Sequence, residues 1–215
     1  MKTVIFDLDG TLVDSRKDIC ASINHVRETL YALPPLDPGT VAEKMNRPGL
    51  DLAREFYGAE RYEARARECF EAHYARQCLV SSRAYPGVRR MLGRLRSADC
   101  DLFVATNAPT DTSRAILRNN HLDGFFADII GADRVRRPKP DPEMLLRAMA
   151  ISRYGEAWMA GDSPKDMMAA EKAGAEGIFV TWGYTRSPDP DLPAKARARK
   201  PEEIADIILD VIESK

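Results

Sequence analysis

The feature that most constrains the fold is an isolated strand at the start of the chain. The apolar letters "VIF" at residues 4–6 predict a buried strand, but residues 15–83 show helical spacing and no second strand. Ile19, Ile23 and Val26, for example, recur at helical intervals. A lone strand is not stable, so this one must pair with strands that come much later in the sequence.

Those later strands are predicted from residue 85 onward, where apolar strand-like runs alternate with amphipathic helical ones. Strands are expected at 101–106, 127–133, 157–161 and 177–183, and helices at 86–97, 110–120, 141–151, 163–174 and 201–214. This alternation predicts an α/β fold with a parallel sheet covered by helices on both faces. We therefore expect a core domain of residues 1–14 and 84–215, an inserted all-helical cap of residues 15–83, and a surface loop at 187–200.

Composition limits the classes of partner. The chain of 215 residues has 44% hydrophobic and 30% charged residues and a net charge of -1, which is typical of a globular protein with no basic surface for nucleic acid. No apolar run approaches the ~20 residues that cross a membrane, and Asp7 interrupts the first run. The four cysteines are far apart, without the spacing of a zinc site. We expect a cytoplasmic protein with neither nucleic-acid nor membrane partners.

Two carboxylates follow the first strand directly. If the chain stays extended, Asp7 and Asp9 point to the same side, roughly 6–7 Å apart. Such a pair beside a buried strand needs compensation by a divalent cation or a shared proton.

The other predicted strands also deliver polar side chains where they end. Thr106 and Asn107 follow the second strand, Lys139 lies between two prolines after the third, and Asp162 and Asp166 follow the fourth. In an open parallel sheet, ligands bind beyond the carboxyl ends of the strands. Carboxylates, an amide, a hydroxyl and one ammonium group suit a phosphate and a hard cation such as Mg²⁺.

Each of these residues also has an ordinary explanation. Asp9 with Gly10 could form a turn, Asp166 could complete a capping box with Ser163, and Lys139 could be a surface lysine. Any one of them alone would favour that explanation. Their joint appearance at successive strand ends favours a site.

Four motifs, in order, carry a family resemblance. "DLDGTLVDS", "ATN", "KPDP" and "GDSPKDMMAAEKAG" resemble the motifs of the haloacid dehalogenase superfamily. The helical insertion after the first motif resembles the C1-capped branch, which includes phosphoglycolate phosphatase. The resemblance covers nearly the whole chain and implies a Rossmann-like core with a helical cap. Asp99 is a departure, because relatives often carry glycine before the second strand.

The resemblance implies roles for the acidic residues. Asp7 would be the nucleophile that forms an aspartyl-phosphate, and Asp9 would protonate the leaving oxygen and later activate water. Asp7, the backbone carbonyl of Asp9, and Asp162 would hold Mg²⁺, with Asp166 in support.

The same resemblance implies that Thr106, Asn107 and Lys139 bind the transferring phosphoryl group. Backbone N–H groups around Gly10 could cradle the phosphate, since glycine allows the tight turn that this requires. Arg47, in the break "NRPG" of the cap, could bind a carboxylate of the substrate, although a solvated arginine is the favoured interpretation.

The presence of Asp9 favours a phosphatase or phosphomutase over a dehalogenase, since an ester on carbon needs no protonated leaving oxygen. Our leading hypothesis is a Mg²⁺-dependent phosphatase for a small phosphorylated metabolite, with phosphoglycolate as the default substrate. A sugar phosphomutase of the β-phosphoglucomutase type and a non-catalytic binding module remain alternatives. Whether the protein is a monomer or a homodimer stays open.

Overall fold

A six-stranded parallel sheet forms the centre of the protein. The computed structural model describes residues 1–47, 49–185 and 189–213. The strand order is β5-β4-β1-β6-β7-β8, and every neighbouring pair is parallel. The strands are β1 (Thr3–Phe6), β4 (Asp101–Ala105), β5 (Asp128–Ile130), β6 (Ala157–Gly161), β7 (Glu176–Val180) and β8 (Ala196–Ala198).

The first strand lies in the middle of this sheet, as its isolation in the sequence predicts. Thr3 of β1 pairs with Asp101 of β4 on one side and with Ala157 of β6 on the other. Side chains of β1 alternate between two apolar clusters, with Val4 in one and Ile5 in the other. The expected α/β fold is confirmed.

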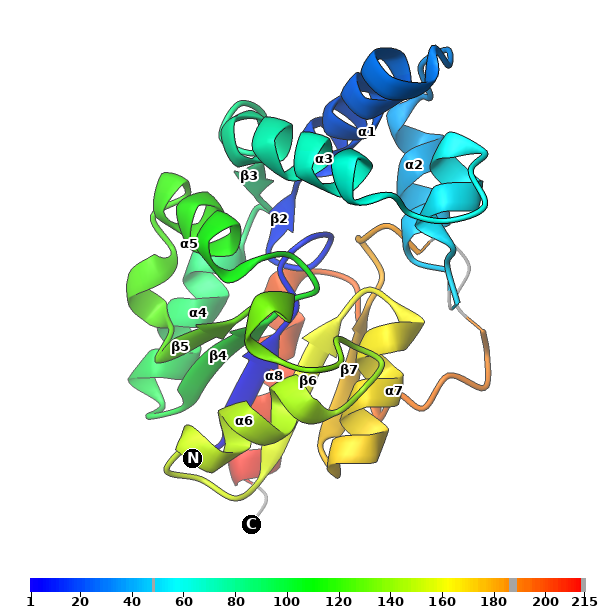
Figure 1. The fold of residues 1–215 in the computed structure, drawn as a ribbon. Coiled ribbons are helices and arrows are strands. Elements are labelled where there is room, and N and C mark those ends of the chain that lie inside the picture. The colour runs from blue at the N-terminus through cyan, green and yellow to red at the C-terminus, as the bar shows by residue number, and fades with distance from the viewer. Residues whose placement is uncertain (48, 186–188, 214–215) are drawn as a thin grey trace.

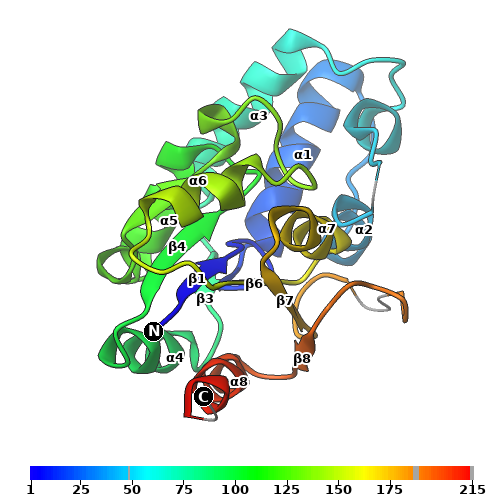
Figure 2. The same cartoon turned by 90° about the horizontal axis from the view of Figure 1, so that it is seen from below.

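Helices cover both faces of the sheet (Figure 2). Buried side chains of α6 and α7 pack on the face that contains Ile5, whereas those of α4 and α8 pack on the face that contains Val4. The bounds of these helices, with α5 beside β5 at the sheet edge, are α4 (Val88–Ser97), α5 (Thr110–Asn119), α6 (Glu143–Ile151), α7 (Pro164–Ala173) and α8 (Pro201–Glu213). Two single turns, η2 (Asp123–Phe125) and η3 (Ala132–Arg134), flank β5. No described helix is long and apolar enough to span a membrane.

The helices between β2 and β3 form a separate layer, which we call the cap (Figure 1). It lies over the end of the sheet where the chain leaves β1. Helix α1 packs on both other helices and buries Ile19, Ile23 and Val26 at the predicted spacing. One π-helical turn replaces part of the expected helical stretch between α2 and α3. The cap elements are α1 (Arg16–Tyr31), α2 (Pro38–Met45), η1 (Ala53–Tyr57) and α3 (Ala64–Gln77).

The chain passes between sheet and cap through a short antiparallel pair. Strands β2 (Val13–Asp14) and β3 (Arg83–Ala84) pair Val13 with Ala84. Next to this pair, the buried carboxylate of Asp18 in α1 accepts hydrogen bonds from the backbone N–H of Ser81 (3.0 Å) and from Ser82 Oγ (2.8 Å). The outgoing and returning segments are therefore held side by side.

Several boundaries differ from the sequence predictions, mostly by one to three residues, and three of them affect the description of the fold. The expected loop at 187–200 contains β8, whose residues extend the sheet beside β7, while residues 187 and 188 lie outside the described residues. Strand β7 ends at Val180 instead of residue 183. Helix α6 begins at Glu143, whose backbone N–H donates to Asp141 Oδ1 (3.1 Å), so Pro142 precedes the helix.

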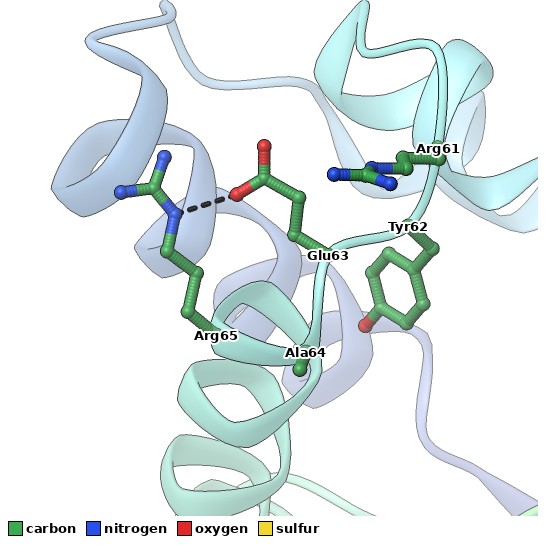
Figure 3. Close-up of a pocket in the computed structure, with 5 residues that line it drawn as sticks. All are labelled: Arg61, Tyr62, Glu63, Ala64 and Arg65. Atoms are coloured by element: carbon green, nitrogen blue, oxygen red, sulfur yellow. Dashed lines mark hydrogen bonds and ion pairs between the residues drawn. The ribbon is translucent and has the colours of Figure 1, made fainter.

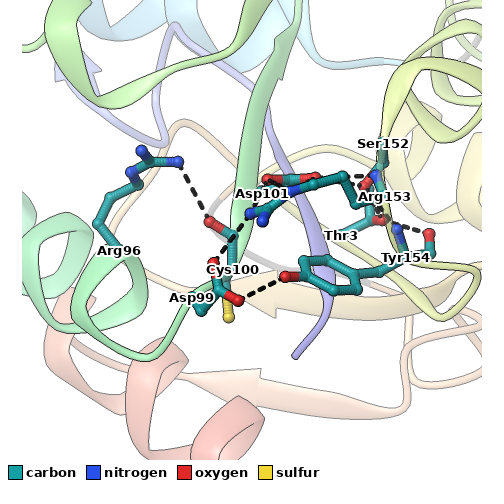
Figure 4. A network of polar contacts seen from close by, with 8 residues as sticks. All are labelled: Thr3, Arg96, Asp99, Cys100, Asp101, Ser152, Arg153 and Tyr154. Carbon is teal, nitrogen blue, oxygen red and sulfur yellow. Dashed lines mark hydrogen bonds and ion pairs between the residues drawn. The ribbon is translucent and has the colours of Figure 1, made fainter.

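A polar network closes the opposite end of the sheet, before β4 (Figure 4). Asp99 has a left-handed φ of 54°, the conformation that glycine adopts most easily. Its carboxylate accepts hydrogen bonds from Arg153 Nη2 (2.9 Å) and Tyr154 Oη (2.7 Å), and Arg153 also pairs with Asp101 (2.7 Å). These contacts give the departure from glycine a local role in a turn far from the predicted site.

Candidate active site

Lys139 brings together two of the predicted carboxylates at the carboxyl end of the sheet. Its Nζ lies 2.8 Å from Asp7 Oδ1 and 2.6 Å from Asp166 Oδ1, and its side chain is 3% exposed. Asn107 clamps the main chain of Lys139 from both sides, because Oδ1 accepts from Lys139 N (3.0 Å) and Nδ2 donates to Lys139 O (2.9 Å). The buried ammonium group is thus fixed in place by the end of a neighbouring strand.

Asp166 has both of the roles considered for it, because it caps helix α7 and also belongs to the polar cluster. Its Oδ2 accepts the backbone N–H of Ser163 (3.0 Å) and so completes the predicted capping box at the start of α7. Its other oxygen binds Lys139. Gly161 allows this packing, since a Cβ there would lie 2.4 Å from atoms of Asp166.

Asp162 is fully buried, and its two oxygens differ sharply in their surroundings. Oδ2 accepts hydrogen bonds from Tyr184 N (2.6 Å) and Asn46 Nδ2 (2.9 Å). Oδ1 has no hydrogen-bond partner among the described residues. Gly10, with φ of 84°, and Gly183 lie so close to Asp162 that a Cβ on either would collide with it, which explains a glycine at both positions.

These carboxylates fit a divalent cation. Ligand oxygens of Asp7, Asp162 and Asp166 lie within 4.8 Å of one another. A buried carboxylate oxygen without a donor is costly unless a cation or proton compensates it. Hard cations such as Mg²⁺ prefer oxygen ligands of this kind. A bound cation would therefore stabilise this arrangement of buried carboxylates, which would otherwise lack sufficient positive charge.

Burial and the mutual repulsion of the carboxylates also shift the pKa values of the cluster. Burial raises the pKa of Asp7 to about 7, although Lys139 opposes the rise, and Asp166 adds to it. Burial also raises the pKa of Asp162 well above its ordinary value, with help from the charges of Asp7 and Asp166. Burial alone would lower the pKa of Lys139, but Asp166 and Asp7 outweigh it and keep the ammonium group charged.

Asp9 lies in a different setting from the one expected. Strand β1 ends at Phe6, and the chain bends at Leu8 into a tight loop whose N–H groups donate hydrogen bonds to the Leu8 carbonyl, so the extended strand assumed for residues 7–9 does not continue. The Asp9 carboxylate accepts a hydrogen bond from Ser15 Oγ and is not part of the three-carboxylate group. Burial raises the pKa of Asp9, against the effect of Ser15. A role for its backbone carbonyl as a metal ligand stays a prediction.

The structure adds to the site three residues that the sequence analysis did not predict there: Ser15, Tyr184 and Asn46. The Tyr184 hydroxyl accepts a hydrogen bond from Ser15 N (2.9 Å), and the Tyr184 backbone N–H donates to Asp162 Oδ2. Because Ser15 Oγ donates to Asp9, Tyr184 connects Asp162 with Asp9 through Ser15. Asn46 arrives from the cap. The only sequence signals were the segments that contain them: Ser15 ends the first motif, Tyr184 ends "TWGY", and Asn46 begins "NRPG".

Among the described residues, no hydrogen bond or ion pair joins Thr106 or Arg47 to the carboxylate cluster. The Thr106 hydroxyl is buried and accepts the backbone N–H of Ala108 (3.1 Å). The Arg47 side chain is 53% exposed, and its Nη2 pairs with Glu43 at 2.9 Å. The substrate contacts expected for both residues stay predictions.

A pocket of about 560 Å³ lies elsewhere, on the cap at the start of α3 (Figure 3). One short segment, residues 61–65, lines it, with an ion pair between Arg65 and Glu63. It contains none of the predicted site residues. The chemistry indicated by Lys139 and its carboxylates therefore does not belong to this pocket.

Comparison with known proteins gives a consistent picture. Residues 4–180 match the family described as haloacid dehalogenase-like hydrolase. The phosphoglycolate phosphatase of Rhodospirillum rubrum is 38% identical over 210 residues, which is 91% of this chain and 86% of that protein. The phosphoglycolate phosphatase of Caulobacter vibrioides is 35% identical over 194 residues, 86% of this chain and 81% of that one.

Solved structures also align over nearly the full length. A predicted phosphoglycolate phosphatase from Haemophilus somnus has a TM-score of 0.80 at 26% identity, covering 97% of this chain and 98% of that chain. A candidate β-phosphoglucomutase from Thermotoga maritima has a TM-score of 0.72 at 26% identity, covering 98% of this chain and 100% of that chain.

Proposed function

Since this chain belongs to the haloacid dehalogenase-like hydrolase family, we propose that it is a Mg²⁺-dependent phosphatase for a small phosphate monoester. Phosphoglycolate is the first substrate to test, because two relatives at 38% and 35% identity bear the name phosphoglycolate phosphatase. The observation that carries the proposal is the buried Lys139 ammonium, which lies 2.8 Å from the Asp7 carboxylate and 2.6 Å from that of Asp166, in a carboxylate cluster that also includes Asp162. A fixed cation next to a buried nucleophile suits attack on an anionic phosphoryl group.

Asp7, Asp162 and the backbone carbonyl of Asp9 would hold the Mg²⁺ ion, with Asp166 in support. The unpartnered Oδ1 of Asp162 supports this assignment. Bound there, the ion would supply positive charge that offsets repulsion between the nucleophilic carboxylate and the phosphoryl oxygens.

The chain's own residues account for both half-reactions. An Asp7 carboxylate oxygen attacks phosphorus, the bond from phosphorus to the leaving oxygen breaks, and Asp9 gives that oxygen its proton. Water then attacks the phosphorus of the aspartyl-phosphate while Asp9 takes a proton from it, which releases phosphate and restores Asp7. The direction of the Asp9 pKa, raised by burial, supports its role as a proton carrier, and Ser15 orients its carboxylate.

The remaining residues bind and orient. Lys139 neutralises phosphoryl charge, and Asn107 keeps Lys139 in position. Thr106 and the backbone N–H groups around Gly10 are assigned to the phosphoryl oxygens. Residues 15–83 are assigned to a separate cap domain that excludes water and contacts the non-reacting part of the substrate.

The test is a screen of the purified protein against a panel of phosphate esters with Mg²⁺, with Asp7→Asn as the matched variant. Wild type is expected to release phosphate, and Asp7→Asn is expected to lose several orders of magnitude in turnover while it stays folded. Borohydride reduction during turnover would convert an acyl phosphate on Asp7 into homoserine, which mass spectrometry detects. Wild-type activity in a folded Asp7→Asn protein would exclude the aspartyl-phosphate route.

One comparison favours a second candidate function, a phosphomutase. The likeness to the candidate β-phosphoglucomutase from Thermotoga maritima covers the whole of that chain. A mutase would pass the phosphoryl group of Asp7 to a sugar phosphate instead of water. Isomerisation of β-glucose 1-phosphate, started by a sugar bisphosphate and faster than phosphate release, would support it. Absence of any single turnover with every ester would favour a non-catalytic binding module.

A further inference from the structure

A cap residue reaches directly into the proposed metal site. Asn46 follows the last residue of helix α2 as its C-cap, and its Nδ2 donates hydrogen bonds to Asp162 Oδ2 (2.9 Å) and Thr185 Oγ1 (3.0 Å). Beside it, Lys165 Nζ donates to the backbone carbonyl of Met45 (2.9 Å). The end of α2 is therefore fastened to the core at two adjoining points, one of which is a carboxylate of the acidic cluster.

The hydrogen bond from Asn46 goes to one oxygen of Asp162 and leaves the other, Oδ1, available to a cation. Oδ2 is saturated by one donor from the core, Tyr184 N, and one donor from the cap, Asn46 Nδ2. Oδ1 has no hydrogen-bond partner among the described residues. Carboxylate oxygens of Asp7 and Asp166 lie close enough to Asp162 to bind the same cation. A cation can thus take Oδ1 without breaking the contact with the cap. A hydrogen bond to the other oxygen of a ligating carboxylate fixes the orientation of that carboxylate.

The residue type at position 46 also matters. An amide donates a hydrogen bond without adding charge. Aspartate there would repel Asp162, and lysine would neutralise the carboxylate and compete with a cation for it. Asparagine is therefore suited to hold Asp162 while leaving its negative charge available.

We propose that Asn46 is a positioning residue that couples docking of the cap to binding of the divalent cation. The inference rests on the proposed function, because it concerns the same metal site. When the cap is docked, Asn46 orients Asp162 for the cation, and a bound cation in turn favours the docked cap. By thermodynamic linkage, the factor by which docking raises cation affinity equals the factor by which the cation favours docking.

The first measurement is cation affinity, with Mg²⁺ titrated by calorimetry and Mn²⁺ by electron paramagnetic resonance. Asn46→Ala and Asn46→Leu both remove the donor but differ in volume, so a packing effect would separate them. Both are expected to bind the cation roughly tenfold more weakly than wild type, the usual lower limit for loss of such an orienting contact. Glu43→Ala is the matched control, since its exposed carboxylate on α2 pairs with Arg47 on the solvent side.

The second measurement is hydrogen exchange of the backbone amides of α2 in the full chain. Mg²⁺ is expected to slow exchange there in wild type and in Glu43→Ala, and to leave it nearly unchanged in both Asn46 variants. Equal cation affinity in wild type and the Asn46 variants, or equal Mg²⁺ protection of α2, would overturn the coupling while leaving the phosphatase proposal intact. Absence of cation binding by wild type itself would instead overturn the metal assignment, and the inference with it.

Discussion

Replacement of Asp7 by asparagine is expected to stabilise the protein in EDTA at pH 8. Burial raises the pKa of Asp7 from an ordinary 3.8 to about 7, with Lys139 opposing the rise. Because the folded protein holds this proton more tightly than the unfolded chain, the associated stability is complete below pH 3.8. It is lost as the pH rises through about 7. Asparagine cannot ionise and avoids that loss.

The size of the effect follows from the pKa values. Each unit is worth about 1.4 kcal/mol, and the folded group is half ionised at pH 7, so wild type should lose roughly 2 kcal/mol between pH 5 and pH 7 through Asp7, and little more above pH 7. For a chain of this length, that corresponds to a fall in Tm of about 4–8 °C. An asparagine side chain at this position would keep an oxygen acceptor for the Lys139 ammonium, which lies 2.8 Å from Asp7 Oδ1 in wild type.

The assay is thermal unfolding followed by circular dichroism from pH 5 to pH 8 in EDTA. Asp99→Asn is the control, because Tyr154 and Arg153 hold the pKa of Asp99 below its usual value and asparagine tolerates its left-handed φ. Its Tm curve should keep the slope of wild type, whereas the curve of Asp7→Asn should be flatter and lie above wild type at pH 8. Parallel curves for wild type and Asp7→Asn, or a lower Tm for the variant at pH 8, would refute the reasoning.

Two further predictions concern catalysis. Asp9→Asn should lower turnover of alkyl phosphates by roughly 10²-fold or more, and of p-nitrophenyl phosphate far less, because nitrophenolate leaves without a proton. Equal losses on both substrates in steady-state assays would argue against proton donation by Asp9. Arg47→Ala should change KM for phosphoglycolate by no more than about twofold, since Arg47 is exposed and pairs with Glu43. A large rise in KM for phosphoglycolate, with p-nitrophenyl phosphate unaffected, would show that Arg47 binds the substrate carboxylate.

The sequence predicted the sheet well because its inner strands are nearly continuous apolar runs. Strand β6 was expected at 157–161 and lies there, and β4 ends one residue early, at Ala105. Strand β8 was missed because "ARA" at the sheet edge has only Ala198 fully buried and offers no apolar run. The family resemblance read from the four motifs is confirmed by the match over residues 4–180.

The site was predictable where strand ends alone deliver the side chain. Asp7, Lys139 and Asp162 follow three different strands, so their meeting follows from the parallel order. The contact of Asn46 with Asp162 spans 116 residues and depends on how the cap docks, which no local pattern reports. The side chain of Asn107 binds the main chain of Lys139, a pairing that only the folded loops define, and its expected contact with the phosphate stays a prediction.

The β2–β3 pair has a consequence for how such a chain can vary. Val13 and Ala84 are paired strand residues, so the whole segment between them is, for the core, a loop whose two ends are in contact. The entropy of closing a loop grows only slowly with its length, and closure here is secured by the paired ends and by Asp18. The segment between them can therefore be lengthened, shortened or exchanged at little expense to the sheet. An insert of another shape could give the same carboxylates and lysine a different substrate.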